Sequence, residues 1–499
     1  MTHEVVVVGG GIGGLTVAAL LAARGLSVCL LERDSRAGGC CAAFDAFGHR
    51  FETGAGLYAS WQPGEIHERV FAELRARAPE ARPVVPAYTF RTPEGSDIEV
   101  GGDFDAFSAN LRAHFPECAG AAVNFYRDAT EIAGALHRTA LHEPALATLS
   151  KLRRIKLTLK EARLSSTILS RANHTAAQHL NATSARFRRF IDAQLQIFAQ
   201  AASDSCPYLY AAVALSQPVR GMYALAGGAQ SLSDALAESF KRSGGALRLD
   251  STALRLAFDS RGVAATGVEL LSGETVAATR AVVSNLTVWD TYGKLAGASR
   301  TPPEVRARLK RLRAWGAYQI FLSLDEEAAR RLPSEQILAL DDWQEAENFD
   351  PERAQLMLSV APAWDARAPA GRRAATLSTF TGAEQWFAFH TGEAEHEEQD
   401  ARALEARWER LHRALPELGA GAEVFETATP RTFYERTRRR LGMAGGIAQT
   451  LEAFGASGAT HLTSVPNLFM VGDTVFPGNG VAAVTQSALI VANEIAPSR

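Results

Sequence analysis

The first 32 residues alternate between apolar runs and glycines in the order typical of a βαβ unit. Residues 4–8 form a continuous run rich in valine, which predicts a strand buried on both faces. An alanine- and leucine-rich helix is predicted over residues 15–23, and a second strand over residues 26–31. Strand, helix and second strand therefore form one unit, which ends at Glu32.

Three glycines between the first strand and the helix match the spacing Gly-x-Gly-x-x-Gly. Gly9 would make the tight turn, Gly11 would let the backbone approach a pyrophosphate, and Gly14 would let helix and strand pack closely. Glu32 at the tip of the second strand could accept hydrogen bonds from the ribose hydroxyls of an adenosine. Because all these parts occur in register, the pattern predicts dinucleotide binding rather than a glycine turn without a ligand.

A second strand–loop–helix pattern lies at residues 466–495. Residues 466–473 predict a buried strand that ends in Gly-Asp, and residues 481–495 predict a helix of small residues. Asp473 could accept a hydrogen bond from a ligand hydroxyl or order a water on the pyrophosphate. The N–H groups from Gly480 onward would point the positive end of the helix dipole at the ligand. Taken alone, the segment is also consistent with an ordinary strand–loop–helix.

The middle of the chain continues with both strand and helix patterns. We predict a hairpin over residues 267–276, strands over residues 246–249, 253–257, 281–285 and 318–324, and helices over residues 233–242 and 404–415. Residues 88–100 predict another hairpin, which would belong to a substrate lobe, and residues 106–205 are rich in helix patterns.

Composition is that of a folded protein, with 47% hydrophobic and 21% charged residues among 499. A formal net charge of −3 argues against a nucleic-acid partner recruited by overall charge. Five cysteines give no disulfide framework, so a reducing compartment fits best. We expect neither a secretory signal nor a transmembrane helix, and we predict no metal site.

Residues 151–160 interleave basic and apolar side chains. As a helix they would suit an anionic membrane surface, and they would equally suit a solvated helix face packed on the protein.

The residues that follow the first fingerprint resemble a known family. Gly38-Gly39, the turn containing Gly54-Ala-Gly56, and Gly472-Asp473 followed by Pro-Gly-x-Gly resemble the carotenoid (phytoene) desaturase and carotenoid cis–trans isomerase family. That family belongs to the amine oxidase-like flavoprotein superfamily. Monoamine oxidases usually carry Gly-Glu at the last strand end, so the pattern here points away from amines.

The resemblance implies FAD as the cofactor, with the glycine pair along its pyrophosphate and Ala253 at its adenine. Cys40 departs from the family, which often has a basic or small polar residue after the glycine pair. Pattern and resemblance together place the following residues in the FAD site: Gly9, Gly11, Ile12, Gly13, Gly14, Glu32, Arg33, Gly38, Gly39, Cys40, Gly54, Ala55, Gly56, Ala253, Gly472, Asp473, Gly480, Val481 and Ala482.

The resemblance also implies an α/β fold with a Rossmann-type FAD-binding domain assembled from three chain segments. We assign residues 1–75, 206–289 and 431–499 to that domain. An α+β substrate-binding domain would comprise residues 76–105 and 290–430, and residues 106–205 would form a helical lobe, a candidate membrane-facing cap.

The function implied is desaturation or isomerisation of a long apolar polyene such as a carotenoid. In the desaturase form, flavin N5 would accept a hydride and pass two electrons to an acceptor such as quinone or oxygen. The protein would be cytoplasmic and peripheral on the inner face of a membrane. No side chain is assigned as the catalytic base; Glu52, in the turn expected near the flavin, is a weak candidate, and the acid there is more simply interpreted as structural.

Two alternatives remain open at this point. A flavin-dependent amine or amino-acid oxidase would share the fold and the N-terminal fingerprint. A non-enzymatic chaperone for prenylated partners would share the fold, but the phosphate site of such proteins is degraded, whereas Gly9, Gly11, Gly14, Glu32 and Asp473 are all present here.

Overall fold

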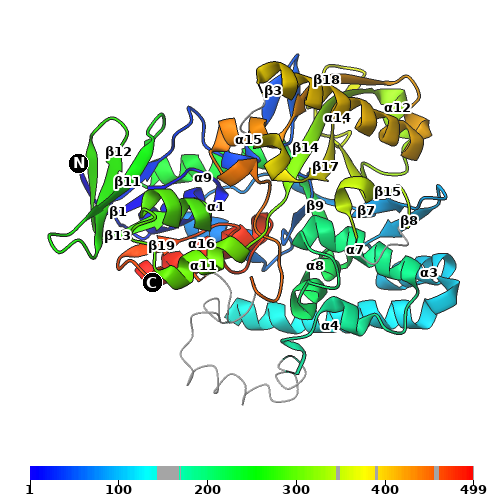
Figure 1. Cartoon of the computed structure of the whole chain (residues 1–499), viewed down its shortest axis with the longest axis horizontal. Coiled ribbons are helices and arrows are strands. Elements are labelled where there is room, and N and C mark those ends of the chain that lie inside the picture. The colour runs from blue at the N-terminus through cyan, green and yellow to red at the C-terminus, as the bar shows by residue number, and fades with distance from the viewer. Residues whose placement is uncertain (143–167, 169, 344–348, 388–391, 454–459, 498–499) are drawn as a thin grey trace.

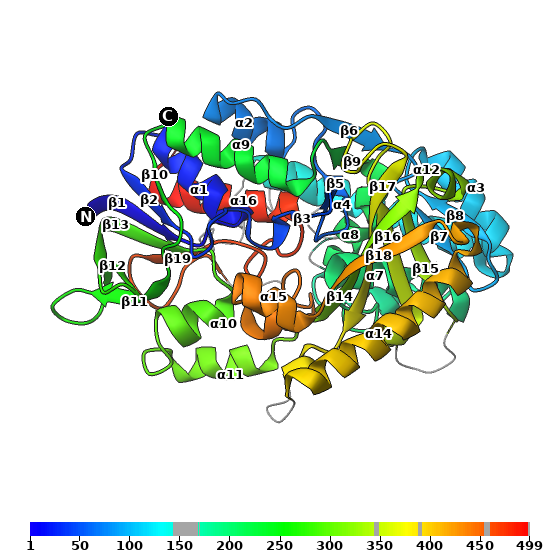
Figure 2. The same cartoon turned by 90° about the horizontal axis from the view of Figure 1, so that it is seen from above.

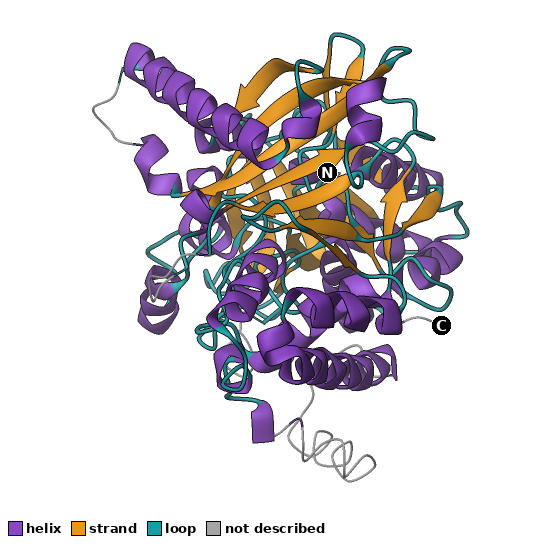
Figure 3. Cartoon of the chain, turned by 90° about the vertical axis from the view of Figure 1, so that its right-hand side faces the viewer, coloured by secondary structure: helices purple, strands orange, loops and turns teal. Residues whose placement is uncertain are grey.

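Two seven-stranded β-sheets lie beside each other, and helices pack around both (Figure 1). The computed structural model describes residues 1–142, 168, 170–343, 349–387, 392–453 and 460–497. Figure 3 shows the strands running through the interior with most helices outside them. This mixture confirms the predicted α/β fold class.

The first sheet takes its strands from three distant stretches of the chain, near its start, its middle and its end. Its N-terminal valines are buried on both faces, as their pattern predicts. The strands are, in order, β10 (Ala246–Arg248), β2 (Val28–Leu31), β1 (Thr2–Val8), β13 (Thr275–Ser284), β12 (Ala265–Leu270) and β11 (Ala253–Phe258), with β19 (Leu468–Met470) paired to β13.

Strand β13 corrects one expectation. The sequence pattern suggests that residues 275–276 end a hairpin and that residues 281–285 form a separate strand, but the structure has one ten-residue strand. Its first half pairs antiparallel with β12, and its second half pairs parallel with β1 and β19. The burial pattern changes accordingly from mixed exposure to full burial, which is why the sequence reads as two elements.

Helices α9 (Ala229–Arg242) and α16 (Val481–Ile495) both pack against α1 (Ile12–Ala23) over this sheet (Figure 2). The predicted helix over 481–495 is confirmed, whereas α1 and α9 begin about one turn earlier than their patterns predict. In both cases the first turn follows a glycine turn and holds a single long apolar residue, Ile12 or Leu232, which is too few to show helical periodicity.

The second sheet carries α14 (Glu393–Ala414) on its outer face (Figure 2). Helix α14 begins eleven residues before the predicted start at 404. The sequence pattern did not predict this part because the first turns are mostly charged and show no apolar period. The predicted 88–100 hairpin joins this sheet as its β7–β8 edge. The strands are, in order, β18 (Ala422–Ala428), β14 (Gly316–Asp325), β17 (Arg372–Thr381), β16 (Gln355–Val360), β15 (Gln336–Leu340), β7 (Tyr88–Arg91) and β8 (Asp97–Val100).

A layer of helices lies below the second sheet in Figure 1. It contains α3 (Phe104–His114), α4 (Ala119–His142), α7 (Ala185–Ala199) and α8 (Tyr208–Arg220). Their core is aromatic, as in the contact between Phe115 and Phe187. The basic stretch at 151–160 lies outside the described residues. Among the described helices, none is long and apolar enough to cross a membrane.

Smaller elements connect these layers. The two-stranded sheet is β3 (Phe44–Ala46) with β4 (His49–Phe51), and the three-stranded sheet is β5 (Tyr58–Ala59), β9 (Met222–Leu225) and β6 (Ala81–Val84). The remaining α-helices are α2 (Ile66–Leu74), α10 (Val288–Asp290), α11 (Pro303–Arg311), α12 (Glu326–Arg331), α13 (Pro351–Ala354) and α15 (Pro430–Thr437). Helix α15 lies between the two large sheets (Figure 2).

Candidate active site

A cavity of about 1170 Å³ extends along the first sheet to helices α7, α8 and α15. Among the residues predicted for the FAD site, Gly14 is the one that does not line it. The cavity therefore brings together the N-terminal fingerprint, the glycine pair, Ala253 and the C-terminal Gly-Asp segment, which are far apart in the sequence.

The N-terminal glycine loop is packed too tightly to accept side chains. A Cβ on Gly14 would lie 2.0 Å from the Gly9 carbonyl oxygen, so this glycine serves the close contact of helix and strand. A Cβ on Gly11 or Gly13 would lie 2.8 or 2.6 Å from the amide of Asn285. Asn285, which ends the β13 region, thus fills the space beneath the loop, and sequence analysis gave it no role in the site.

The glycine pair packs directly on this loop. The N–H of Gly38 donates to the Gly10 carbonyl at 2.9 Å, and a Cβ on Gly39 would lie 3.2 Å from the Gly11 Cα. The two glycine segments therefore contact each other through their backbones on this wall of the cavity. Because no side chain lies between them, the N-terminus of α1 remains open to the cavity. Cys40 follows in the wall, and burial raises the pKa of its thiol.

Glu32 lines the cavity with its carboxylate anchored at both oxygens. One oxygen accepts the Gly10 N–H at 2.5 Å and the other accepts the Asp34 N–H at 2.8 Å. Each oxygen keeps a second lone pair for a ribose hydroxyl. The neighbouring Arg33 directs its guanidinium to backbone carbonyls at the end of α15, including that of Glu435 at 3.2 Å.

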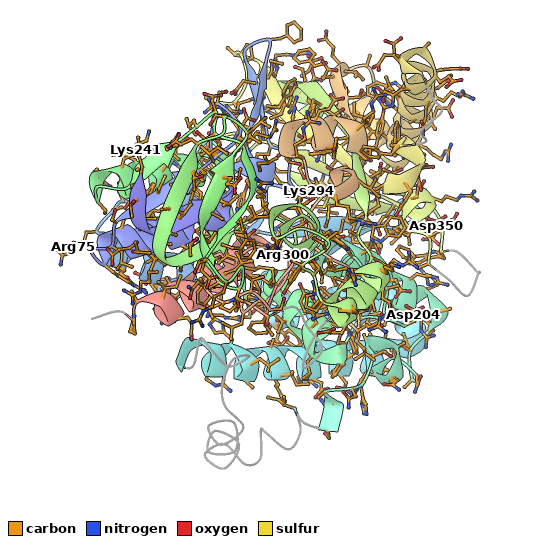
Figure 4. All side chains as sticks on the ribbon, turned by 60° about the vertical axis from the view of Figure 1, so that its left-hand side comes forward. Arg75, Asp204, Lys241, Lys294, Arg300 and Asp350 are labelled. Atoms are coloured by element: carbon orange, nitrogen blue, oxygen red, sulfur yellow. The ribbon has the colours of Figure 1, made fainter. Side chains whose placement is uncertain are left out.

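Basic side chains distant in the sequence donate hydrogen bonds to backbone carbonyls at the C-terminal end of α15. Lys294, labelled in Figure 4, donates to the Arg438 carbonyl at 3.2 Å and pairs with Asp290 at 2.8 Å. Because Arg438 lines the cavity, this contact joins α15 to the wall beyond β13.

Asp473 forms a largely buried ion pair that the sequence did not predict. Arg439 Nη2 lies 2.9 Å from one Asp473 oxygen and also donates to the Gly445 carbonyl at 2.6 Å. Burial opposes the charge on Arg439, but the Asp473 carboxylate holds the pKa of the guanidinium above its usual value. The run of three arginines at 438–440 is the signal that could have drawn attention to this residue.

The start of α16 faces the cavity from the opposite side. Gly480 caps the helix with φ +95°, and Gly480, Val481 and Ala482 all line the cavity. The N–H of Asn479 donates to the Tyr210 hydroxyl at 3.3 Å, which ties this loop to α8. Two helix N-termini, of α1 and α16, thus face one cavity.

Glu52 lies in the wall with its carboxylate already engaged. It accepts the Ala229 N–H at 2.9 Å and pairs with Arg367 at 2.8 Å. It also accepts the Tyr58 hydroxyl, and burial together with the Glu52 charge raises the pKa of that phenol. These contacts connect Glu52 to β5, to the connection between β16 and β17 of the second sheet, and to the start of α9.

One end of the cavity is apolar. We use the name apolar chamber for the part lined by Leu57, Ala59, Ile197, Phe198, Val213, Ala214 and Met222. None of the cavity-lining residues that the structure describes on α7, α8, β5 or β9 is charged. The chamber therefore suits an apolar occupant.

The dinucleotide part of the cavity has the features that FAD needs. Its glycine cradle has no room for side chains, its two helix N-termini favour phosphate and flavin negative charge, and Glu32 can receive a ribose. A family model described as flavin containing amine oxidoreductase matches residues 12–496. The chain belongs to the flavin-containing amine oxidoreductase family. It is an oxidoreductase with FAD as its cofactor, as the family resemblance implied.

Curated proteins similar to this chain match nearly its whole length. Prolycopene isomerase of Arabidopsis thaliana is 25% identical over 99% of this chain and 82% of its own length. All-trans-retinol 13,14-reductase of Homo sapiens is 23% identical over 99% of this chain and 85% of its own length.

Solved structures show the same fold. A putrescine oxidase variant superposes with a TM-score of 0.66 at 15% identity, covering 99% of both chains. An oxidoreductase from Methanosarcina mazei superposes with a TM-score of 0.63 at 17% identity, covering 98% of this chain and 99% of its own.

Proposed function

We propose that this flavoprotein oxidoreductase desaturates or isomerises a long apolar polyene such as a carotenoid. The observation that carries the proposal is the apolar chamber, which opens from the same cavity as the dinucleotide cradle. When bound, FAD would supply reversible two-electron and hydride chemistry. Prolycopene isomerase and retinol reductase, two similar proteins, are both named for polyene substrates, which supports the same class here.

The protein's own residues would bind and orient. The glycine loops and the N-terminus of α1 would hold the pyrophosphate, and Glu32 would hold the adenosine ribose. The N-terminus of α16 would stabilise negative charge on the reduced flavin. Arg439 would hold Asp473 oriented toward the ribityl or pyrophosphate.

We assign Glu52 a positioning role in preference to that of a base. Its carboxylate is shared among Arg367, Tyr58 and the Ala229 N–H, so removing a substrate proton would compete with three existing contacts. By linking the second sheet to α9, it would hold the flavin-side turn at 54–56 in place.

The chamber also argues against an amine oxidase. A charged amine or amino acid entering it would be desolvated without an ionised partner from α7, α8, β5 or β9 among the residues described there. The likeness to putrescine oxidase concerns the fold alone. A non-enzymatic chaperone role is disfavoured because the cradle is intact.

We further propose the domain assignment that the sequence predicts. Residues 1–75, 206–289 and 431–499 would bind FAD, residues 76–105 and 290–430 would complete the substrate-binding domain, and residues 106–205 would cap the site toward a membrane. The protein would work in the cytoplasm at the inner face of a membrane, with quinone or oxygen as the acceptor in the desaturase form.

Expression in a host that accumulates partly unsaturated carotenoids tests the proposal. A red-shifted pigment spectrum indicates desaturation, and an altered cis peak indicates isomerisation. Ala214→Phe would fill the chamber from α8, so it should retain the yellow flavin spectrum but lose pigment conversion.

Ala394→Phe, on the exposed start of α14, is the matched control and should behave as wild type. The proposal fails if the wild-type protein leaves every polyene unchanged but amines rapidly bleach its flavin without oxygen. Conversion by Ala214→Phe at the wild-type rate would show that the chamber is not the polyene site.

A further inference from the structure

One face of helix α8 forms a wall of the apolar chamber. Tyr210, Val213, Ala214 and Gln217 follow each other at helical spacings of three, four and seven residues from the first, and all four line the cavity. Three of these four positions present aliphatic or aromatic carbon to the chamber. Gln217 places a primary amide on the same wall.

The other polar side chains on this wall are satisfied by the protein. Gln200, at the end of α7, donates to the Ala444 carbonyl at 2.7 Å and accepts the Trp315 N–H at 3.3 Å. The Tyr210 hydroxyl accepts the Asn479 N–H. The Gln217 side-chain amide, in contrast, has no hydrogen-bond partner among the residues that the structure describes, although its backbone carbonyl accepts the Gly221 N–H.

Charged groups near the same end of α8 are engaged with one another. Arg220 pairs with Glu65 at 2.9 Å, and Glu65 also meets His137 at 2.9 Å. They therefore satisfy each other, and none of the three lines the cavity. Gln217 is left as the polar group that an occupant of this end of the chamber would meet.

A pure hydrocarbon in the chamber would remove water from this amide and offer nothing in exchange. Leaving a desolvated polar group without a hydrogen bond has a free-energy cost large enough to weaken binding about tenfold or more. A ligand hydroxyl or carbonyl would instead complete the amide's hydrogen bonds, because the amide has both donors and an acceptor.

We propose that Gln217 recognises an oxygen function on the substrate, so that the preferred substrate is a polyene bearing a hydroxyl or carbonyl group rather than a bare hydrocarbon. The inference rests on the proposed polyene function and adds the specificity of its site. Gln217 lies seven residues along α8 from Tyr210, which corresponds to about 10 Å. Since Tyr210 contacts the loop before α16, the oxygen is recognised well away from the flavin-facing loop, at an end of the polyene.

Binding to the FAD-loaded protein tests this inference. All-trans-retinol and its deoxy hydrocarbon, in which hydrogen replaces the hydroxyl, are titrated in detergent while the visible flavin absorption is followed. The wild-type protein should bind the alcohol about tenfold more tightly than the hydrocarbon. Gln217→Met, which has nearly the same shape without polar hydrogen bonding, should lose this preference by binding the alcohol less and the hydrocarbon more tightly.

Two controls separate specificity from damage. Val213→Ala enlarges the chamber beside Gln217 and should weaken both ligands equally, and Gln399→Met on α14 should change neither. An unchanged flavin spectrum in each variant shows that the protein is folded. Equal affinities in the wild type, or an unchanged preference in Gln217→Met, would overturn the assignment of Gln217.

Prolycopene distinguishes this failure from that of the proposed function. If prolycopene is converted while the alcohol has no advantage, the oxygen recognition is wrong and the polyene function stands. If prolycopene, the alcohol and the hydrocarbon all fail to bind, both proposals fall.

Discussion

Arg439 and Asp473 form an ion pair beside the glycine loops, in which the single atom Nη2 of Arg439 lies 3.1 and 2.9 Å from the two carboxylate oxygens. The side chains are only 15% and 17% exposed, so each charge depends on the other. Asp473→Asn would leave the guanidinium without its counter-ion, at a cost of about 3–5 kcal/mol in the free energy of unfolding. Urea unfolding of the FAD-loaded protein measures this loss.

The double variant Arg439→Met/Asp473→Leu should regain much of that stability, since it removes both charges, yet bind FAD weakly. Glu238→Gln, which removes a partner from the exposed pair with Arg242, should change stability by less than about 1 kcal/mol. Equal losses at the two sites would contradict the importance given to the buried pair.

Gly14→Ala is expected to disrupt the nucleotide fold. The added Cβ would overlap the Gly9 carbonyl oxygen, and backbone cannot move aside as a flexible side chain could. The variant should be recovered largely without flavin and should melt well below the wild type. Gly120→Ala in α4, where a Cβ meets nothing within 4 Å, should instead leave stability unchanged or raise it by up to about 1 kcal/mol.

Glu52→Gln distinguishes a positioning acid from a base. If Glu52 positions the flavin-side turn through Arg367 and Tyr58, the variant should lose about 1–3 kcal/mol of stability while the pH profile of turnover stays the same. A general base would behave differently, with turnover falling about 100-fold or more at unchanged stability. Rates across pH and a thermal melt of the same preparations decide between the two.

Arg436 should contribute charge to FAD binding. It lines the cavity and stacks on Phe44 at 4.8 Å, and it has no ion pair within the described part of the chain. Arg436→Met should weaken FAD binding about tenfold and make it less sensitive to salt, because one attraction to the pyrophosphate is lost. Reconstitution of the FAD-free protein at two salt concentrations measures both effects.

The control for this prediction comes from the same helix. Arg431 pairs with Glu393 at 2.7 Å and does not line the cavity. Arg431→Met should bind FAD as the wild type does, and an equal loss in both variants would assign the effect to α15 rather than to Arg436.

His67 should make the protein sensitive to mild acid. Burial lowers the pKa of its imidazole from 6.5 to about 3, and its ring stacks on Trp61 at 4.4 Å. Below pH 6.5 the unfolded chain takes up a proton that the folded chain refuses until about pH 3. Stability should therefore fall by about 1.4 kcal/mol per pH unit through this window.

His67→Phe keeps an aromatic ring against Trp61 and removes the titrating group. Unfolding free energies at pH 7 and pH 5 should then differ by about 2 kcal/mol less than in the wild type. An unchanged difference would show that His67 does not titrate between the two states. His461, whose pKa burial lowers to about 4, provides a further acid-sensitive contribution that this variant leaves in place.

Local patterns were enough to predict the parts of the fold that depend on neighbours in sequence. The Val5–Val8 run, the glycine spacing up to Gly14 and the helix at 481–495 each contain their own signal. The place of Gly38-Gly39 beside the first glycine loop, in contrast, was implied by the family resemblance and not by a local pattern.

The contacts missed are those made across the fold. Arg439 meets Asp473 and Asn285 fills the space under Gly11 only after the sheet has assembled. Glu52 reads as an isolated acid until Arg367, 315 residues later, reaches it. The sequence of α8 predicts a face buried in the protein core, because hydrophobic periodicity does not distinguish a face that packs on protein from one that lines a cavity.

Strand β13 also sets the order in which the nucleotide domain can be completed during synthesis. Val5 pairs with Ala281, and Val282 pairs in turn with Leu468. At ordinary translation speeds the emerging β1 waits roughly a quarter of a minute to a minute before its central neighbour leaves the ribosome. Throughout that interval the four valines of β1 have one open edge, so the nascent chain should depend on chaperones until β13 is made.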